Sequence, residues 1–258
     1  NTFLLEKGNE LGGLASLISK IPAKNRLADF PHYLMHRAEQ LDNLYIFKNT
    51  EGTPENIRKF HPNIIVSSTG SAPLLPPIAG LKDRIDNENH NIYSILGMIS
   101  HINDFPKDLE GKKVVVVGGG AVGLDVVEFF ADRNADISIV EMMDQIGRDL
   151  DPVSKNDTKT MLKKHNVHQL TKTALLEVKD SSFLVRGDGE PYELPFEYGF
   201  VCLGMRAQGQ LYQNLTEEFS SEDVEIMNIG DSQRARRIID GTQEGRNILT
   251  ILEQKGYL

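Results

Sequence analysis

The stretch KVVVVGGGAVGLDVVEFF, residues 113–130, decides the fold of this chain. A β-branched apolar run ends at Val117, three glycines follow, and a helical pattern begins after Gly120. The glycines give the spacing G-x-G-x-x-G at the point where a predicted strand turns into a predicted helix. That context makes the motif specific, because it is where such a turn binds a dinucleotide pyrophosphate.

Each glycine of the motif has its own physical task. Gly118 permits the tight turn, Gly120 lets the backbone approach the pyrophosphate, and Gly123 lets the helix pack close to the strand. The helix N-terminus supplies free amide donors and the positive end of the helix dipole. We therefore predict dinucleotide contacts along the whole turn, at Gly118, Gly119, Gly120, Ala121, Val122 and Gly123.

An acid follows the glycine motif at the distance that a ribose requires. The run Ile137–Val140 ends at Glu141, 23 residues after Gly118, where a carboxylate accepts hydrogen bonds from both ribose hydroxyls. A 2′-phosphate would face this carboxylate, and the two methionines that follow carry no cation. The pattern favours NAD over NADP, although Arg148 keeps NADP open. A glycine-rich turn that binds nothing would leave the position of Glu141 unexplained.

Composition and charge exclude several classes of protein. A length of 258 residues allows one large core or two ordinary domains. A net charge of −9 disfavours nucleic acid as a partner. No apolar run approaches the roughly 20 residues that span a bilayer, and no secretory signal opens the chain. We expect a cytoplasmic protein that binds neither nucleic acid nor membrane.

Few side chains suggest metal binding or acid–base catalysis. Cys202 is the only cysteine, which excludes an internal disulfide, and its apolar run predicts a buried, inert thiol. The seven histidines lack ligand spacing; His32 and His36 are four residues apart, but without an acid motif. The basic cluster at residues 234–237 is interpreted as a helix start or a solvated face. We predict neither a metal site nor a catalytic side chain.

The order of predicted elements indicates an α/β fold with parallel sheets. Short β-rich runs alternate with helical patterns, and a hydroxyl followed by proline at Thr53-Pro54 marks a further helix start. Residues 167–195 differ, with four short strands and a Gly-Asp-Gly turn that predict an antiparallel meander. The strands are expected at 2–5, 44–47, 63–68, 113–117, 136–140, 197–203 and 224–229. The helices are expected at 26–41, 121–133, 153–164 and 236–253.

Two punctuated stretches, at residues 72–80 and near 204–222, predict crossovers between domains. The chain would then leave one domain and return to it. We expect residues 1–75 plus 205–258 to form one domain and residues 76–204 to form a second, inserted domain.

The opening stretch FLLEKGNELGG, residues 3–13, looks like the later part of a second dinucleotide-binding unit. Its apolar run ends in Glu6, and Gly12-Gly13 follow. A strand that ends in an acid of this kind usually holds a ribose. No glycine-rich turn precedes this acid in the sequence.

These motifs together resemble the two-dinucleotide-domain flavoprotein reductases, in which an NAD(P)H domain is inserted into an FAD domain. Residues 68–73 and 201–206 look like the two links between those domains, and EIMNIGD at 225–231 looks like the late FAD motif. The resemblance is closest to the C-terminal half of the 2-enoate reductase and 2,4-dienoyl-CoA reductase group. The stretches GDSQRARRIIDGTQEGRN at 230–247 and VEMMDQIGRDLDP at 140–152 carry it.

The resemblance implies a Rossmann-like NAD(P)H domain, carrying the meander, within an FAD-type Rossmann-like domain. NADH would reduce FAD here, and an N-terminal barrel with FMN, and usually an iron–sulfur cluster, would reduce an activated C=C bond. Glu141 leans towards the enoate-reductase side. The implied site adds Gly204 for NAD, and for FAD it comprises Glu6, Gly12, Gly13, Thr69, Gly70, Gly230 and Asp231.

In that family the FAD domain begins with a strand and its own glycine-rich loop, upstream of the ribose acid. We therefore expect an FAD-type domain without its first strand and phosphate loop, unless an upstream segment lies outside this sequence. The first residue is not Met, which suggests a processed chain or a fragment. The isolated chain should bind NADH and hold little or no FAD.

Two alternatives stay open beside the electron-input module. One is a free-standing NADH oxidase or a relative of the ferredoxin reductases, and the other is a non-catalytic NAD-binding domain that has lost FAD. The final substrate and the oligomeric state, including a homo-oligomer, also stay open.

Overall fold

The computed structural model describes residues 1–257, which fold into two compact units. Unit 1 comprises Asn1–Ser19, Arg26–Ala72 and residues 205–257. Unit 2 comprises Lys20–Asn25 and Pro73–Gly204. The short segment Lys20–Asn25 is a feature that the sequence did not predict. Because of it, the chain passes between the units four times rather than twice.

Unit 2 is built on a parallel sheet whose central strand is the apolar run before the glycines. The strands lie in the order β5, β12, β6, β7, β8, and each pairs in parallel with its neighbours. β6 is the central strand, and its residues Val114 to Val117 are all buried, as expected of a strand covered on both faces. The strands are β5 (Ile92–Tyr93), β6 (Lys113–Val117), β7 (Asp136–Val140), β8 (His168–Leu170) and β12 (Tyr198–Val201).

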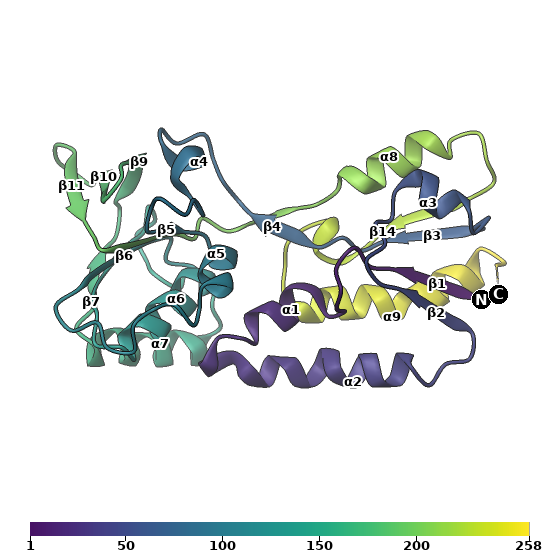
Figure 1. Cartoon of the computed structure of the whole chain (residues 1–258), viewed down its shortest axis with the longest axis horizontal. Helices are drawn as coiled ribbons and strands as arrows, with labels where there is room; N and C mark the ends of the chain where they lie inside the picture. Colours follow the sequence, from purple (N-terminus) through teal and green to yellow (C-terminus); the bar gives the residue numbers. More distant parts are fainter. Residues whose placement is uncertain (258) are drawn as a thin grey trace. The chain divides into compact units, whose positions relative to one another are not determined.

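The helices of unit 2 begin at side chains that cap them. Ser94 Oγ accepts from the Gly97 amide at 3.1 Å before α5, and Asp151 Oδ1 accepts from the Val153 amide at 3.0 Å before α7. Such caps satisfy amides that have no partner within the helix. The helices are α4 (Leu81–Arg84), α5 (Ile95–Ser100), α6 (Ala121–Ala131) and α7 (Pro152–Lys164) (Figure 1).

An antiparallel sheet covers one face of the parallel sheet. Its strands lie in the order β11, β10, β9, and Phe183 and Val185 of β10 pack in one cluster with Val115 and Val117 of β6. The strands are β9 (Ala174–Val178), β10 (Ser182–Arg186) and β11 (Tyr192–Pro195). This confirms the α/β class with parallel sheets and an antiparallel insertion.

The predicted meander was wrong in one strand. Residues 168–170 form β8, which pairs in parallel with β7 at the edge of the large sheet. The physical reason is the preceding helix, α7, because a strand–helix–strand crossover brings the chain back parallel to its first strand. The antiparallel sheet therefore begins only at Ala174.

Unit 1 contains two separate pairs of parallel strands. β1 (Thr2–Leu5) pairs with β2 (Leu44–Phe47), and β14 (Glu225–Asn228) pairs with β3 (Ile64–Ser67). The helical segments are α1 (Gly13–Ile18), η1 (Pro22–Ala28), α2 (Asp29–Ala38), α3 (Pro54–Arg58), α8 (Gln210–Glu218), η2 (Gly230–Ser232) and α9 (Ile238–Gln254), of which η1 begins in the segment assigned to unit 2. The helix predicted from Arg26 is a 3-10 turn followed by α2, and Thr53 caps α3 as expected.

A short ribbon lies at the two predicted crossovers. β4 (Ser71–Pro73) and β13 (Met205–Ala207) are hydrogen-bonded neighbours. At either end of this ribbon the Leu74 amide donates to the Gly204 carbonyl, and the Gln208 amide donates to the Gly70 carbonyl, both at 2.9 Å. The two punctuated stretches of sequence therefore run together here.

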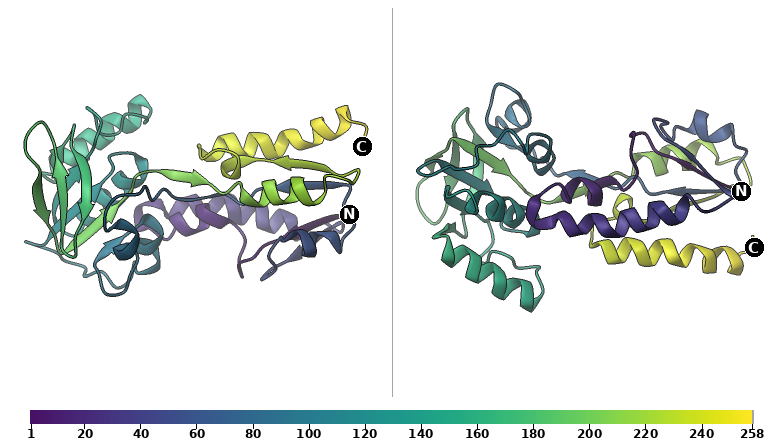
Figure 2. Two further views of the ribbon diagram at one scale, coloured as in Figure 1. Left: turned by 90° about the horizontal axis from the view of Figure 1, so that it is seen from above. Right: turned by 60° about the horizontal axis from the view of Figure 1, so that its bottom comes forward.

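The two units differ greatly in how much apolar surface they bury. Of 35 buried apolar side chains in the described chain, 31 lie in unit 2 and four in unit 1. The long helices α2 and α9, which run roughly parallel in Figure 2, bury only Pro31 and Leu252. Each leaves apolar side chains exposed, among them Phe30, Leu34 and Leu249. Most of the hydrophobic stabilisation of the described chain therefore lies in unit 2.

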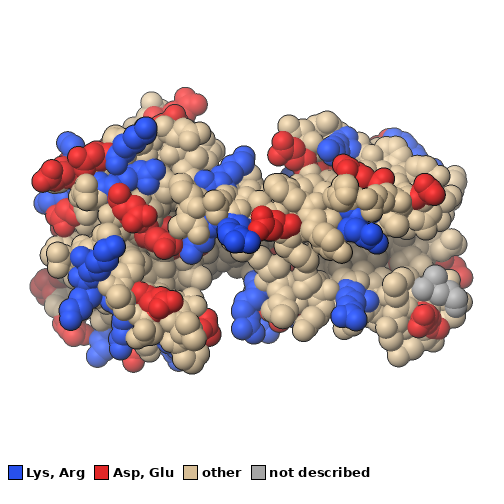
Figure 3. Space-filling model, turned by 90° about the horizontal axis from the view of Figure 1, so that it is seen from below, with Lys and Arg blue, Asp and Glu red and all other residues tan. Residues whose placement is uncertain are grey.

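The surface carries both signs of charge. On the face shown in Figure 3, Lys and Arg are interspersed with Asp and Glu. No helix in the described part of the chain is long and apolar enough to cross a bilayer.

Candidate dinucleotide sites

The glycine turn of unit 2 needs glycine at two positions for steric reasons. Gly118 has φ of +108°, in the left-handed region, and a Cβ there would overlap the carbonyl oxygen of Cys202. A Cβ at Gly123 would overlap the carbonyl oxygen of Gly118. Gly118 therefore allows the turn to lie close to the chain after β12, and Gly123 allows α6 to lie close to the turn.

Gly120 is different, because no steric need within the chain explains it. It has an ordinary φ of −79°, it is the N-cap of α6, and no atom lies within 4 Å of a Cβ placed there. A side chain would project into open space at the helix N-terminus. This open space, beside the free amides of the first turn, fits a pyrophosphate.

The carboxylate of Glu141 is fixed by two backbone amides. Its Oε2 accepts from the Gly119 amide at 2.6 Å, and its Oε1 accepts from the Met143 amide at 2.7 Å. The structure thus brings together the acid and the glycine turn, as the sequence predicted. Each carboxylate oxygen keeps a further lone pair with which it can accept from a ribose hydroxyl.

Two further predicted residues lie at the same edge of the sheet. The Cys202 amide donates to the Val117 carbonyl at 2.7 Å, so the chain after β12 runs beside the glycine turn. Gly204 follows with φ of +101°, and no atom lies within 4 Å of a Cβ placed there. Ala121 begins α6, next to the turn. This edge is the carboxyl end of the parallel strands, where open α/β sheets bind ligands.

The acid of unit 1 sits in a corner with a regular hydrogen-bond pattern. Glu6 Oε1 accepts from the Gly8 amide, two residues along the chain, at 2.7 Å. The Glu6 amide donates to the Phe47 carbonyl, and the Glu6 carbonyl accepts from the Thr50 amide, both at 2.9 Å. The Asn49 amide donates to the Gly8 carbonyl, also at 2.9 Å.

The corner around Glu141 repeats this pattern bond for bond. The Glu141 amide donates to Leu170, its carbonyl accepts from Thr173, and the Lys172 amide donates to Met143, all at 2.9 Å. Asn49 and Lys172 occupy the corresponding position and have nearly the same left-handed φ, 53° and 52°. The two acids therefore end their strands in the same local architecture.

Sequence reasoning missed this internal repeat, although a small signal was present. A threonine stands three residues after the last residue of β2 and of β8, at Thr50 and Thr173. In both cases its hydroxyl donates to a carbonyl two residues back, that of Lys48 or Thr171. A threonine at this spacing after a strand could have marked the matching corners.

The two acids differ in one contact. Glu141 also accepts from an amide of the glycine turn, whereas within the described residues Glu6 accepts only from Gly8. Gly12 and Gly13 follow Glu6 in the left-handed region, with φ of 102° and 51°, at the start of α1. Glu6 and Gly12 thus lie in the segment that connects β1 to α1 in unit 1, and Gly13 is the first residue of α1.

The other residues predicted for FAD gather at the ends of β3 and β14. Asp231 Oδ2 accepts from Ser71 Oγ, and Asp231 Oδ1 accepts from the Arg236 amide, both at 3.0 Å. Gly230 has φ of 65°, and its amide donates to Glu244 Oε2 at 2.6 Å. Thr69 and Gly70 follow β3, and Thr69 Oγ1 donates to the Gln208 carbonyl at 2.7 Å.

The basic cluster at residues 234–237 directly precedes a helix, which agrees with the first of its two interpretations. Arg237 is the N-cap of α9, and Arg236 pairs with Glu244 on that helix. The hydrogen bond to Glu244 raises the pKa of Arg236, and the bond from Arg236 lowers the pKa of Glu244. Sequence reasoning had not foreseen that the Arg236 amide also holds Asp231.

Cys202 is buried, as predicted, and burial raises the pKa of its thiol to about 12. Residues 1–257 contain no group of three or more His, Cys, Asp or Glu side chains that could hold a metal ion.

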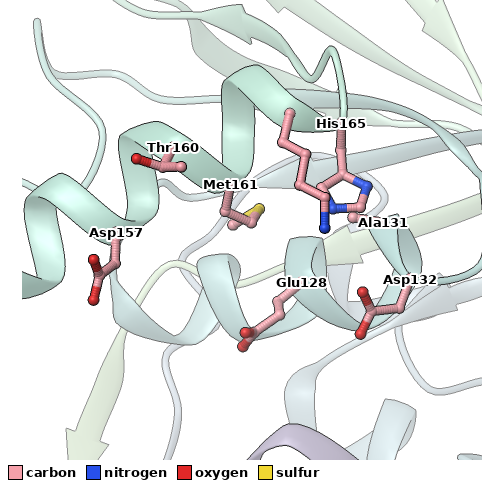
Figure 4. Close-up of a pocket in the computed structure, with 8 residues that line it drawn as sticks. Glu128, Ala131, Asp132, Asp157, Thr160, Met161 and His165 are labelled. Carbon is pink, nitrogen blue, oxygen red and sulfur yellow. The ribbon is translucent and has the colours of Figure 1, made fainter.

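A cavity of about 300 Å³ lies between α6 and α7, away from the glycine turn. Glu128 of α6, its C-cap Asp132 and Asp157 of α7 line it, together with Thr160, Met161 and His165 (Figure 4). Three carboxylates outnumber the one lysine of its lining, Lys164, so the cavity is unsuited to an anionic dinucleotide. The candidate dinucleotide site is instead the open space beside Gly120 at the glycine turn.

Comparison with known proteins matches this chain to one family. Residues 35–227 match the pyridine nucleotide-disulphide oxidoreductase family. The NADH oxidase of Thermoanaerobacter brockii is 25% identical over 243 residues, covering 94% of this chain and 36% of that protein. The bilirubin reductase of Mediterraneibacter gnavus is 26% identical, covering 94% and 35%. The cinnamate reductase of Clostridium sporogenes is 21% identical, covering 74% and 27%.

A solved structure shares the fold. The 2-naphthoyl-CoA reductase complex superposes with a TM-score of 0.79 at 22% identity, covering 95% of this chain and 35% of that chain. The chain therefore spans about a third of the length of the NADH oxidase, the bilirubin reductase and the 2-naphthoyl-CoA reductase.

Proposed function

The chain belongs to the pyridine nucleotide-disulphide oxidoreductase family, and on this premise we propose that it passes a hydride from NADH to FAD. It would be the electron-input module of a larger flavin-dependent oxidoreductase. Membership of the family implies binding of FAD and NAD(P)H. The observation that carries the proposal is the Glu141 carboxylate, which is fixed between the glycine turn and the end of β7.

In this proposal the residues of unit 2 bind and orient the nicotinamide dinucleotide. The first turn of α6 holds the pyrophosphate, Gly120 leaves room for it, and Glu141 accepts from the ribose hydroxyls. The carboxylate disfavours a 2′-phosphate, which supports NADH over NADPH. Gly204 lies at the same edge of the sheet and leaves space beside it.

Unit 1 would hold FAD through the residues at its two strand pairs. The matching corner supports Glu6 as a ribose ligand, because Glu141 has the same local architecture. Asp231, with Gly230, Thr69 and Gly70, would hold the flavin end of the cofactor, and Gly12 and Gly13 would line the adenosine side. The described residues supply one glycine-rich phosphate turn, in unit 2. We therefore expect the isolated chain to retain little FAD.

The cofactors supply the chemistry: NADH donates a hydride and the flavin accepts it. The protein must hold the two rings in register and keep water from them. No proton transfer by a side chain is needed for this step. The proposal accordingly assigns no catalytic acid, base or nucleophile.

The final electron acceptor would be an activated C=C bond of the enoate type. We propose that a partner barrel, with FMN and an iron–sulfur cluster, reduces it. The names of the cinnamate and 2-naphthoyl-CoA reductases support this class of acceptor. The chain covers only 27% and 35% of those proteins, which leaves room for a further domain. The relative named NADH oxidase favours a second candidate, transfer of electrons to oxygen. A non-catalytic NAD-binding domain is the third.

Two measurements on the purified chain test the core of the proposal. Titration with NADH, followed by nicotinamide fluorescence, should show saturable binding, weaker for NADPH. The absorbance spectrum should lack a stoichiometric flavin band near 450 nm, as flavins absorb there. Absence of NADH binding would contradict all three candidates: the electron-input module, the oxygen-reducing enzyme and the NAD-binding domain. Stoichiometric FAD would contradict only the expectation that unit 1 retains little FAD.

Added FAD then separates the candidates. The oxygen-reducing candidate predicts that the chain, with NADH and excess FAD, consumes oxygen catalytically. The module predicts reduction of an artificial electron acceptor only when the remaining part of the parent enzyme, or a high concentration of FAD, is supplied. The non-catalytic candidate predicts NADH binding without any NADH oxidation above that of free FAD.

A further inference from the structure

A six-residue segment of the chain belongs to unit 2, although the residues before and after it in the sequence belong to unit 1. This segment, Lys20–Asn25, follows Ser19 and precedes Arg26. Ile21 is 1% exposed, so the segment is anchored by a buried side chain rather than lying loosely on the surface. Nothing assigned so far to either cofactor site explains the segment.

The segment places one cation on the helix that follows the glycine turn. Lys24 Nζ lies 3.0 Å from Asp125 Oδ1 and 3.2 Å from Glu128 Oε2, and both carboxylates belong to α6. The Lys24 and Asp125 side chains are 30% and 24% exposed. Screening by water is therefore weaker here than at a fully exposed ion pair.

The two carboxylates stand in an unfavourable place for an anion-binding helix. Asp125 is five residues after Gly120, the N-cap of α6, which is about 7.5 Å along the helix axis. Glu128 lies one turn further. Negative charge at this distance opposes the positive helix end that is proposed to bind the pyrophosphate. The single positive charge of Lys24 offsets one of these two negative charges.

The titration of the pair agrees with a partly buried ion pair. Burial raises the pKa of Asp125 and outweighs the attraction of Lys24. Burial alone would lower the pKa of Lys24, but Asp125 and Glu128 raise it above its ordinary value. Without Lys24, therefore, a half-buried carboxylate would remain uncompensated on α6.

We propose that Lys24 is an electrostatic positioning residue of the NADH site, which increases affinity for the pyrophosphate by offsetting part of the negative charge of Asp125 and Glu128 on α6. The inference rests on the proposed binding of NADH at the glycine turn. It assigns a role in NADH binding to a segment that is flanked on both sides by residues of unit 1.

The test is NADH affinity in four variants of the full chain, measured by fluorescence titration. Lys24→Met should weaken binding by about fivefold at low salt, and the loss should shrink at high salt. Lys24→Arg keeps the charge and should bind like the parent chain. Lys179→Met is the charge-matched control, since Lys179 pairs with Glu193 on the antiparallel sheet and should not affect binding.

The double variant Lys24→Met with Asp125→Asn separates charge from structure. If Lys24 acts through its charge, removing the Asp125 carboxylate restores the net charge of the group and should recover most of the lost affinity, although the ion pair is still absent. If Lys24 only ties the segment down, the double variant should bind as weakly as Lys24→Met, and the inference is overturned. Unchanged affinity in Lys24→Met would overturn it too. Failure of the parent chain to bind NADH would instead refute the proposed function.

Discussion

At the scale of single residues, two glutamates carry most of the functional argument. Glu141 and Glu6 each end a strand, and each accepts from the amide two residues further on. The sequence predicted both acids from the apolar runs before them. It could not show that the two corners share the same hydrogen bonds, because those bonds come from β8 and β2, which lie far along the chain.

Glu141→Gln should weaken NADH binding by about tenfold or more. The amide group would place an N–H against one of the two backbone amides that the carboxylate now accepts from, and ribose would lose a charged acceptor. Fluorescence titration measures the effect. Glu6→Gln is the matched control in the other unit and should leave NADH affinity unchanged; equal losses in both variants would contradict the assignment of Glu141.

Cys202 should behave as an inert thiol in the folded protein. Because burial raises its pKa to about 12, the thiol stays protonated throughout the range from pH 6 to about 9, and thiolate is the reactive form. A disulfide reagent such as DTNB should therefore react with less than one thiol per chain over many minutes at pH 8. It should titrate one thiol after denaturation. Fast stoichiometric reaction in the native chain would show that the site is open.

At the scale of elements, the turn between β6 and α6 links sequence to chemistry. Two of its glycines are required by neighbouring backbone, at Gly118 and Gly123, whereas Gly120 faces open space. The sequence predicted this turn because strand, glycines, helix and acid are all local signals. It misplaced β8, because parallel pairing is decided by the crossover through α7 rather than by the residues of β8 themselves.

Alanine at Gly123 should lower stability, whereas alanine at Gly120 should lower NADH affinity and leave stability unchanged. Gly123→Ala pushes a methyl group into the Gly118 carbonyl, so it should lower the melting temperature by several degrees. Gly120→Ala meets no atom and has a compatible φ, so stability should be kept. NADH affinity should nevertheless fall about tenfold, since the methyl group occupies the space for the pyrophosphate. Thermal melts and NADH titration give the two readouts; unchanged affinity in Gly120→Ala would contradict the site.

At the scale of the whole molecule, the two units are unequal. Unit 2 holds 31 of the 35 buried apolar side chains in the described chain, and unit 1 relies on a small cluster around Ile65, Leu215 and Phe219. Stability follows buried apolar area, so unit 1 should open at lower cost than unit 2. Its pairs of strands also expose main-chain edges that have no partner among the described residues.

Limited proteolysis should therefore cut unit 1 first. We expect a protease-resistant fragment that covers residues 73–204, identified by mass spectrometry, while sites in α2 and α9 are cleaved early. NADH should slow the later cleavage of that fragment, because a ligand stabilises the state that binds it. Early cleavage between β6 and β8, with unit 1 intact, would contradict this order of stability.

The sequence by itself determined the α/β class, the glycine turn, both acids and most strand positions. Each of these depends on local signals: apolar periodicity, glycine spacing and a carboxylate at a strand end. Only the tertiary structure decided the edge position of β8, the repeated corner at Glu6 and Glu141, and the docking of Lys24 on α6. These features join residues that are distant in the chain. Hydrogen bonds and ion pairs of that kind are set by how the elements pack, and apart from the threonine that follows β2 and β8 no local pattern indicates them.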